Sequence, residues 1–501
     1  MFCFLSVLGH AAAQLSGDSE TESTLLPETE TEETIEVGIE QNEYEENTEN
    51  ADIENGIETI FLHGTKKFYC GYPVDEAFLC WVAANYGHET VMGLADALST
   101  GNTDPEVWYQ LTGNSMHVLW MNYCVQIGFE TYRYENVVWK EAADASCIKL
   151  DFVGDINFDQ EWHTLEMAGG VEGISSCISE GIKKELQSAD VTVVNNEFVY
   201  TKQGEAQEGK TYCFRADPSD VKFLEVFGTD MVSVANNHVY DYGEQGFLDT
   251  LDTLENAGIA YCGGGRNISE ATDAKYFIVG GRKIAIVSAT EIERFSHFTK
   301  SAGTDTPGVL KTQQTKELKQ AIRNAAKNSD YVIAFLHWGT EGKIHYDSEQ
   351  KKLGALCVKA GADAVIGGHP HRLQGVEFID DVPVAYSLGN FWFSTGDLYT
   401  AIAQIQIDGN GELTLQMIPC VHKDVKTYLC EGEEEKKEFY HYLADVSSNV
   451  AMDENGRIYP YKDVTEPGQS SYAYTSGRRY GQHYDDVDLD LNKIDIVGNL
   501  Q

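Results

Sequence analysis

The chain has 501 residues, of which 42% are hydrophobic, so it is long enough for two or three domains with buried cores. Its formal net charge of −44 means that the surface repels nucleic acid phosphates and anionic lipid headgroups. The composition therefore argues against a protein that binds nucleic acid or a bilayer surface.

The N-terminal segments show no pattern of a folded domain. Residues 1–14, MFCFLSVLGHAAAQ, are a short apolar run that ends in alanines, as a secretory signal peptide does. The basic start of such a signal is missing, so either the start is truncated or misassigned, or the run is no signal. Residues 15–58 are rich in Asp and Glu and contain no Lys or Arg, which predicts a disordered acidic linker. We expect an exported protein whose contact with a membrane, where it has one, is a retained N-terminal anchor.

Residues 59–145 are predicted to form a small helical module. VDEAFLCWVAANYG, 74–87, has apolar residues at helical spacing and ends on a glycine, as helices commonly do. TDPEVWYQLTG, 103–113, repeats this pattern, and NSMHVLWMNYC, 114–124, is a candidate third helix. The histidines in this module are scattered, so it offers no evident chemistry.

Residues 146–460 change to strands that alternate with amphipathic helices. Short runs rich in Val and Ile end abruptly in Gly, Asn, Asp or His, and continuous apolar runs are typical of strands buried on both faces. The alternation predicts an α/β sandwich with helices outside. The seven runs are 148–156, 191–197, 231–238, 283–290, 331–339, 364–371 and 382–390. A further helix is expected after residue 431, and residues 461–501 are expected to be a disordered acidic tail.

Five of these strand ends carry residue types that bind metal ions. Loops at the carboxyl ends of strands in an α/β sheet converge on one crevice, so residues far apart in the chain are predicted neighbours. Carboxylate, amide and imidazole ligands suit one or two divalent ions of Mn, Fe, Zn or Mg better than a thiolate-loving ion. The residues are Asp155 with Asn157, Glu197, Asn237 with His238, His337, and His369 with His371.

The stretch AVIGGHPH, 364–371, places two histidines where an apolar strand stops. We expect Gly367 and Gly368 to let the chain turn without a Cβ clash, so that both imidazoles point into one pocket. The alternative is a surface turn that happens to carry two histidines.

These motifs resemble those of the CapA-type proteins of bacterial capsule and poly-γ-glutamate synthesis. The matching stretches are GDIN, VNNE, VSVANNHVYDYGEQGFLDTLDTL, FLHWGTE, GADAVIGGHPHRLQGVE and YSLGNF, in the family's order over about 148–452. That family is similar in fold to calcineurin-like metallophosphoesterases. The resemblance implies a four-layer α/β sandwich of that type, preceded by the small helical module.

The resemblance also implies a ligand set for two ions. Glu197 takes the position of a carboxylate that bridges both ions, and Asn237 would bind through its amide oxygen. His337 and His369 would complete one site, and His371, with Asp155, the other. The metallophosphoesterase pattern has Asp-x-His on its first strand. This chain has Asp155 but Asn157 in place of the histidine, which weakens the expectation of a second ion.

Beside the ions, the resemblance implies residues that act on substrate. His238 would serve as general acid or charge stabiliser, oriented by Asp241. Asn195 is a candidate for binding substrate, as is Arg215, for which a surface salt bridge is the alternative.

Two functions are compatible with these expectations. The first is an exported metal-dependent hydrolase in cell-envelope polymer metabolism, acting on a phosphoester or on an anionic polymer at the bacterial surface. The second is a non-catalytic, metal-containing scaffold that binds or helps export such a polymer. Capsule synthase proteins are candidate partners for either. A nucleic-acid phosphodiesterase fits the fold but not the charge.

The eleven cysteines include no C-x-x-C pair, which excludes a zinc ribbon or a thioredoxin motif. Cys420 and Cys430 flank a short loop and are a candidate disulfide; buried free thiols are the alternative.

Overall fold

The computed structural model describes residues 55–461 apart from 124–136 and several shorter gaps, together with residue 53 and residues 472–474. The chain divides into two compact units, Met1–Tyr132 and Arg133–Gln501. The signal-like segment 1–14 and most of the predicted linker lie outside the described residues. Residues 55–63 are helical, so the predicted linker is helical at its C-terminal end. Among the described residues, we find no helix with the length and apolarity needed to cross a bilayer.

The first unit is helical, as predicted. It contains α3 (Glu76–Tyr86), α4 (His88–Ser99) and α5 (Glu106–Thr112). The Asp75 side chain accepts the Phe78 N–H at the start of α3, and Gly87, at φ 91°, ends that helix. The predicted third helix at 114–124 lies only partly within the described residues.

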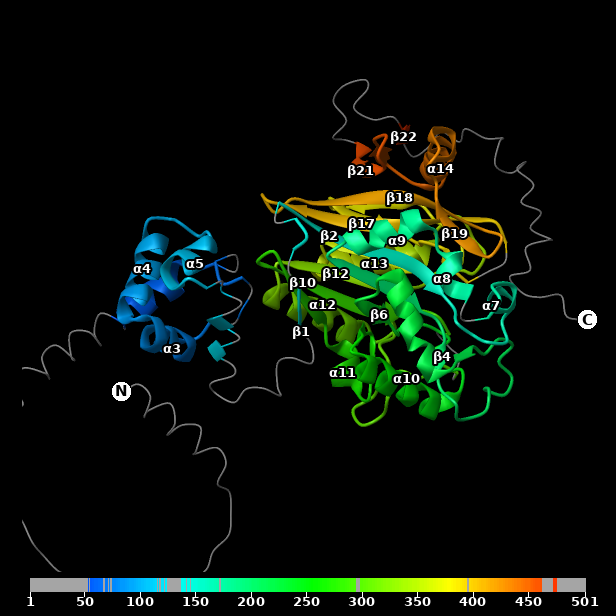
Figure 1. The fold of residues 1–501 in the computed structure, drawn as a ribbon, viewed down its shortest axis with the longest axis horizontal. Helices are drawn as coiled ribbons and strands as arrows, with labels where there is room; N and C mark the ends of the chain where they lie inside the picture. The colour runs from blue at the N-terminus through cyan, green and yellow to red at the C-terminus, as the bar shows by residue number, and fades with distance from the viewer. Residues whose placement is uncertain are drawn as a thin grey trace, which may run out of the picture. The chain divides into compact units, whose positions relative to one another are not determined.

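The second unit contains two stacked β-sheets, here called sheet A and sheet B (Figure 1). In order across sheet A lie β1 (Val137–Lys140), β9 (Lys275–Val279), β10 (Arg282–Thr290), β12 (Tyr331–His337), β13 (Ala364–Gly368), β15 (Val382–Ala385) and β14 (Val376–Ile379). Across sheet B lie β22 (Tyr472–Tyr474), β20 (Val450–Met452), β21 (Arg457–Pro460), β18 (Leu413–Lys423), β17 (Leu398–Asp408), β2 (Cys147–Ile156), β3 (Val191–Asn196), β6 (Met231–Ser233) and β7 (Ala260–Cys262). Two further strands pair with strands of sheet B outside this order: β16 (Asn390–Trp392) pairs with β2, and β19 (Lys426–Leu429) pairs with β18.

Shorter elements complete the second unit. Its remaining strands are β4 (Val199–Tyr200), β5 (Arg215–Ala216), β8 (Gly264–Gly265) and β11 (Gly308–Val309). Its helices are α7 (His163–Met167), α8 (Ile174–Cys177), α9 (Glu180–Ser188), the 3₁₀ segment η2 (Pro218–Phe227), α10 (Gly243–Ala257), α11 (Ile268–Thr272), α12 (Thr315–Asn328), α13 (Ser348–Ala360) and α14 (Glu433–Val446). In Figure 1, α14 and β21 appear in orange at the top of this unit.

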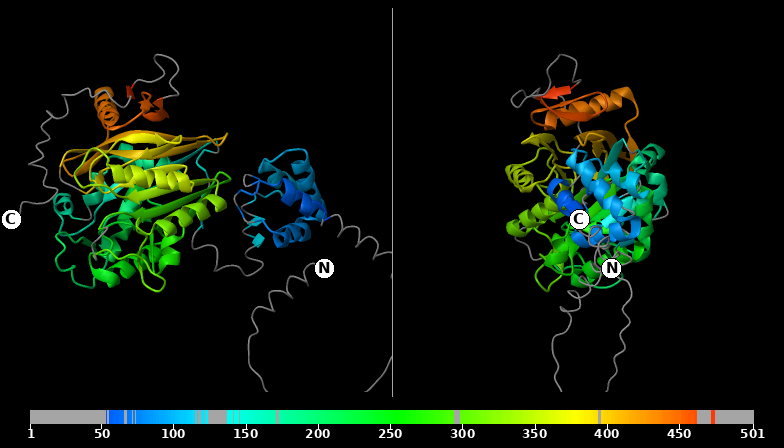
Figure 2. Two further views of the ribbon diagram at one scale, coloured as in Figure 1. Left: turned by 180° about the vertical axis from the view of Figure 1, so that it is seen from behind. Right: turned by 90° about the vertical axis from the view of Figure 1, so that its left-hand side faces the viewer.

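Helices cover the outer face of each sheet, which gives four layers. Between the sheets, the rings of Phe152 on β2 and Phe335 on β12 meet edge to face at 5.7 Å. Outside sheet B, α9, η2 and α10 bury residues such as Leu251. Outside sheet A, α12 and α13 bury residues such as Ile322, and Figure 2 shows these helices from behind. The predicted four-layer α/β sandwich is confirmed, with all seven predicted strands present as β2, β3, β6, β10, β12, β13 and β15.

Two segments differ from the sequence-based expectation. Residues 137–140 fall in the range expected to be helical, but they form β1, which pairs with β9 of sheet A. Residues 472–474 fall in the predicted disordered tail, but they form β22, which pairs with β20. Both segments contain β-branched or aromatic residues, which pack well on a pleated sheet. The sequence-based expectation had followed the composition of the surrounding residues and not these short runs.

Asp151 on β2 is a buried carboxyl whose ionisation opposes folding. Its Oδ1 accepts a hydrogen bond from Gln404 Nε2 at 2.9 Å, and burial raises the pKa of Asp151 to about 8. The unfolded chain ionises near pH 4, so between about pH 4 and pH 8 the folded state binds more protons, and stability falls as the pH rises.

We therefore expect an Asp151→Asn variant to match the parent near pH 4 and to exceed its unfolding free energy at pH 8 by on the order of 5 kcal/mol. Urea unfolding measured from pH 4 to pH 9 tests this. Asp305→Asn, which removes the same side-chain charge from an exposed position outside the core, serves as the matched control. A parent and Asp151→Asn variant with the same pH profile would contradict the expectation.

Candidate metal centre

The predicted ligands meet where strands of the two sheets end together. Asp155 lies at the end of β2 and Glu197 directly after β3, both in sheet B. His337 ends β12, and His369 and His371 follow β13, both in sheet A. All five side chains are buried, and the most exposed, His369, retains 6% of its surface. Two overlapping groups have ligand atoms within 4.8 Å of one another, Glu197–His337–His369 and Asp155–Glu197–His371.

The first group is tightly gathered around His337 Nε2. Three atoms with lone pairs surround this nitrogen: Asn237 Oδ1 at 2.8 Å, His369 Nδ1 at 3.2 Å and Glu197 Oε1 at 3.3 Å. His337 Nε2 carries at most one hydrogen, which cannot satisfy three acceptors. Glu197 Oε1 is buried and accepts no hydrogen bond from any described residue.

These four atoms fit a divalent ion. An ion bound at ~2.1 Å to two adjacent ligands holds their atoms about 3 Å apart, which is the spacing seen here. An orphaned buried carboxylate oxygen among imidazole nitrogens is also the feature that a cation would satisfy. We name this set, Glu197, Asn237, His337 and His369, the tight site.

The second group is looser. His371 Nδ1 lies 3.4 Å from Asp155 Oδ2, and His371 Nε2 lies 3.9 Å from Glu197 Oε1. His371 Nδ1 also lies 2.7 Å from Asn390 Oδ1, so its hydrogen points at that amide and leaves Nε2 to face Glu197. The oxygen of Asn157 accepts the Asp159 N–H at 2.8 Å in a local turn, so this predicted ligand is engaged by its own loop. We name Asp155, Glu197 and His371 the loose site.

The ionisation of the histidines follows from burial and from the two carboxylates. Burial lowers the pKa of His337 to about 3, and burial together with the neighbouring His337 lowers the pKa of His369 well below its usual value. Both are therefore neutral at pH 7, as metal-binding imidazoles must be. Burial also opposes charge on His371, but Glu197 and Asp155 outweigh it and raise the pKa of His371 to about 9.

The pKa values of the two carboxyl groups are shifted in opposite directions. Burial would raise the pKa of Asp155, but its contacts with His371, His337 and Asn195 hold that pKa below the ordinary value. Burial and the charge of Asp155 raise the pKa of Glu197 well above its ordinary value. Without a cation between them, the two carboxylates repel each other.

The backbone at the two histidines is in the left-handed region. His369 has φ 95° and His371 has φ 54°, which is costly for residues with a Cβ and is found mainly where function requires it. Our expectation that Gly367 and Gly368 make the turn was wrong, because both continue β13 without a positive φ. They are needed for close approach instead, since a Cβ would lie 2.1 Å from Tyr386 O at Gly367 and 2.8 Å from Asp155 Oδ1 at Gly368.

His238 is held by a chain of buried polar groups. Its Nδ1 lies 2.7 Å from Asp241 Oδ2, which also accepts the Phe214 N–H, and burial lowers the pKa of His238 although Asp241 opposes this. Lys210 Nζ lies 2.7 Å from Asp241 Oδ1 and 2.8 Å from Glu293 Oε1. Lys210 also donates to the backbone oxygen of Asn237, the residue whose side chain belongs to the tight site. Nothing in the sequence around Lys210 had indicated this role.

The two residues predicted to bind substrate take different positions. Asn195 donates to Asp155 Oδ1 at 2.7 Å and accepts from Asn236 Nδ2 at 3.1 Å, so both ends of its amide are engaged inside the protein. The first of these hydrogen bonds braces the carboxylate of Asp155. The guanidinium of Arg215 lies over the Tyr242 ring at 4.4 Å, and no described carboxylate lies within ion-pair distance of it. Its neighbour Phe214 packs against His238 at 4.4 Å between ring centroids.

The described cysteines carry no disulfide. Cys420 and Cys430 are both buried free thiols, so the structure agrees with the second of the two alternatives for this pair.

Part of the chain is similar in sequence to known capsule synthesis proteins. Residues 149–395 match a family model described as bacterial capsule synthesis protein PGA_cap. The chain is 27% identical over 317 residues to the PGA biosynthesis protein CapA of Bacillus subtilis, a match that covers 62% of this chain and 81% of that protein. It is 28% identical over 259 residues to the capsule biosynthesis protein CapA of Bacillus anthracis, covering 50% of this chain and 62% of that one.

Two more distant likenesses were found. A probable polyglutamine synthesis accessory protein of Mycobacterium tuberculosis is 28% identical over 214 residues, which is 41% of this chain and 56% of that protein. Among solved structures, a 5′-nucleotidase from Candida albicans aligns with a TM-score of 0.30 and 10% identity, covering 54% of this chain and 48% of that chain.

Proposed function

We propose that the chain, whose residues 149–395 match the family model of the bacterial capsule synthesis protein PGA_cap, is an exported metal-dependent hydrolase of cell-envelope polymer metabolism. The observation that carries the proposal is the tight site, where three lone-pair atoms surround His337 Nε2 within 3.3 Å. Export is supported by the apolar run at 1–14 and the acidic segment that follows it. Recovery of the protein only in the cytoplasm of fractionated cells would contradict export.

Each residue has a defined part in the proposed reaction. Divalent ions at the tight and loose sites would polarise a substrate oxygen and supply hydroxide at neutral pH. His238, with 7% of its surface exposed, would present Nε2 to a leaving group at the edge of the centre; only its imidazolium form, whose charge Asp241 stabilises at Nδ1, could give that group a proton from Nε2. Asp241 holds Nδ1 of the same ring, so the ring orientation is fixed before substrate arrives. Arg215 offers a guanidinium for a substrate carboxylate or phosphate.

Metal content and turnover together test the proposal. We expect elemental analysis of the full chain, after incubation with Mn²⁺, Fe²⁺ or Zn²⁺, to give one firmly held ion and a second, weaker one. A His369→Ala/His371→Ala double variant should hold neither ion and should lose turnover of phosphodiester and γ-glutamyl test substrates. His345, exposed in a loop, provides the matched control, because His345→Ala should keep both ions.

A His238→Ala variant separates chemistry from metal binding. We expect it to keep the metal content of the parent and to lose at least about 100-fold in turnover, the range expected for a general acid. If the parent takes up no ion, or if turnover survives complete metal removal, the proposed hydrolase is wrong.

A non-catalytic scaffold is the second candidate, and a specific observation favours it. Asn157 stands where the family resemblance implies a histidine ligand, and its oxygen is already engaged by Asp159. An ion bound at the tight site alone, with no turnover of either substrate class, would support this scaffold, which would bind or help export an anionic polymer.

A further inference from the structure

A groove of ≈ 490 Å³ runs between α12 and α13 on the outer face of sheet A. Its walls are cationic and its floor is apolar. The cationic residues are Lys319 and Arg323 from α12 and Lys352 and Lys359 from α13, and the floor consists of Ala355, Leu356 and Ala360. We call this the basic groove.

The charge of the basic groove is opposite to that of the chain. The whole sequence has 80 acidic residues against 36 Lys and Arg, yet no carboxylate lines this groove. Lys352 pairs with Glu349 at 2.6 Å on the exposed rim. No described carboxylate lies within 4.0 Å of the charged groups of Lys319, Arg323 or Lys359, so these cations are available to an outside anion.

Helical spacing aligns the cations on both walls. Lys319 and Arg323 are four residues apart, so they lie one above the other about 6 Å apart along α12. Lys352 and Lys359 are seven residues apart, which places them on one face of α13 about 10 Å apart. The two rows face each other across the apolar floor, which suits an extended chain with anionic groups on both sides.

The groove leads toward the edge of the sheet that carries the metal centre. β10, β12 and β13 are parallel, and α12 and α13 connect them, so both helices run opposite to the strands. The two helices therefore begin at the carboxyl ends of the strands, where His337 and His369 lie, and they run away from that edge.

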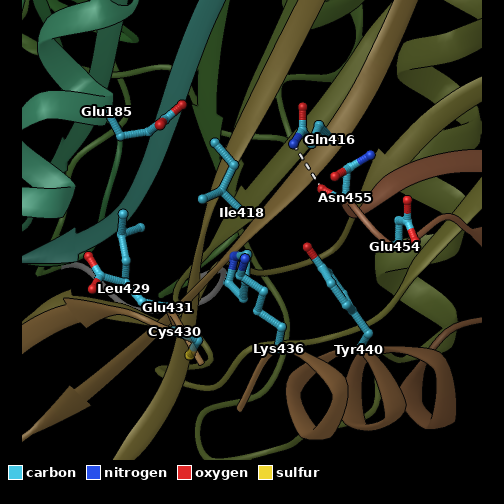
Figure 3. A pocket seen from close by; sticks show the side chains of 11 residues that line it. Glu185, Gln416, Ile418, Leu429, Cys430, Glu431, Lys436, Tyr440, Glu454 and Asn455 are labelled. Atoms are coloured by element: carbon cyan, nitrogen blue, oxygen red, sulfur yellow. Dashed lines mark hydrogen bonds between the residues drawn. The ribbon is translucent and has the colours of Figure 1, made fainter. Parts of the chain in front are cut away.

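A second pocket is lined mainly by acidic side chains, opposite in charge to those of the basic groove. A pocket of ≈ 280 Å³ bordered by α9, β18, β19 and α14 is lined by Glu185, Glu431 and Glu454 around the single cation Lys436 (Figure 3). An anionic polymer would be repelled there, so the two hollows give the outer surface of this unit one site of each sign.

We propose that the basic groove binds a chain of a carboxylate-rich polymer such as poly-γ-glutamate. The polymer carboxylates would pair with the three available cations, and its methylene groups would pack on the alanines and Leu356 of the floor. The choice of polymer rests on the proposed function, whereas the sign of the charge and the groove shape come from the structure alone. The groove would hold the polymer along α12 and α13, which begin at the same edge of sheet A as the metal centre.

The test uses the full chain and fluorescently labelled poly-γ-glutamate, with binding followed by anisotropy. We expect an Arg323→Glu/Lys359→Glu variant, with one charge reversed on each wall, to bind at least about tenfold more weakly than the parent at low salt. Parent binding should weaken as salt is raised, because exposed charges are screened. Lys184→Glu/Lys437→Glu is the matched control: it makes the same change in net charge at exposed positions of α9 and α14, and its affinity should stay within about twofold of the parent.

Further variants and ligands distinguish a defect in the basic groove from a defect elsewhere in the protein. When Arg323→Glu/Lys359→Glu is introduced into the His369→Ala/His371→Ala variant, it should still weaken polymer binding by at least about tenfold, so a failed metal centre cannot be mistaken for a failed groove. Equal affinities for the parent and the groove variant would overturn the proposal, as would an equal loss in the control variant. Binding of vesicles with anionic phosphatidylglycerol through these residues, without binding of the polymer, would assign the groove to a membrane and would also overturn it.

Discussion

A Glu197→Gln variant is expected to be at least as stable as the parent when both are free of metal, and to lose the stabilisation that divalent ions give the parent. Glutamine keeps the shape of the side chain but removes its charge. Glu197 is fully buried, its Oε1 accepts no hydrogen bond from any described residue, and it lies beside the Asp155 carboxylate. Removing a buried carboxyl whose ionisation is opposed by burial and by the charge of Asp155 relieves a cost of folding.

The effect on metal has the opposite sign. Glu197 belongs to both the tight and the loose site, so the neutral amide weakens every ion at the centre. We expect metal affinity to fall by at least about 100-fold, more than the loss typical for a group that only supports a ligand. An ion that binds the folded state stabilises it by mass action, so the rise in Tm on adding Mn²⁺ should be large in the parent and nearly absent in the variant.

Thermal unfolding with chelator and with added Mn²⁺ measures both effects in one experiment. Glu377 on β14 lies outside the centre, so Glu377→Gln should leave the response to metal unchanged and serves as the control. A Glu197→Gln variant that is markedly less stable without metal, yet responds to metal as the parent does, would make Glu197 a structural residue and contradict both candidate functions.

The strands and the ligand types were predictable from the sequence for a physical reason. Strands buried on both faces must be continuous apolar runs, and polar residues can begin only where such a run leaves the core. Asp155, Glu197 and His337 stand at those points, so their meeting followed from the direction of parallel strands. The sequence did not show that the ends come from two stacked sheets, since the runs of sheet A and sheet B have the same composition.

Other features depend on contacts that a local pattern does not contain. Lys210 lies in a polar loop without periodicity and is buried only because Asp241 and Glu293, far away in the sequence, approach it. The left-handed backbone of His369 and His371, and the close approach of Gly367 to Tyr386 and of Gly368 to Asp155, depend on residues that are distant in the sequence or on dihedral angles that no residue pattern marks. The engagement of Asn157 by Asp159 is a local turn, and its Asn-x-Asp spacing could have indicated it.

The second large effect is expected for Lys210→Met, which should lower the free energy of unfolding by about 3–5 kcal/mol, the cost of removing one partner from a buried ion pair. The Lys210 side chain is only 7% exposed and neutralises two carboxylates, one of them fully buried. Burial would lower the pKa of Lys210, but Asp241 and Glu293 outweigh it and raise that pKa, so the lysine is charged. Methionine keeps most of the apolar volume and removes only the ammonium group.

Urea unfolding at pH 7.5 gives the size of the loss, and a second variant identifies its cause. In Lys210→Met/Glu293→Gln one of the two uncompensated charges is gone, so the double variant should be more stable than Lys210→Met alone. The loss of unfolding free energy in Lys210→Met should also become smaller as the pH is lowered toward 5. The reason is that the Glu293 carboxylate, left without its lysine partner, can then take up a proton. A loss below about 1 kcal/mol would contradict the burial of a charged network.

The same variant should also affect the candidate metal centre. Lys210 donates to the backbone oxygen of Asn237, and through Asp241 it holds the ring of His238. Lys210→Met should therefore disturb both the tight site and the proposed acid, which the loss of a purely local ion pair would not do.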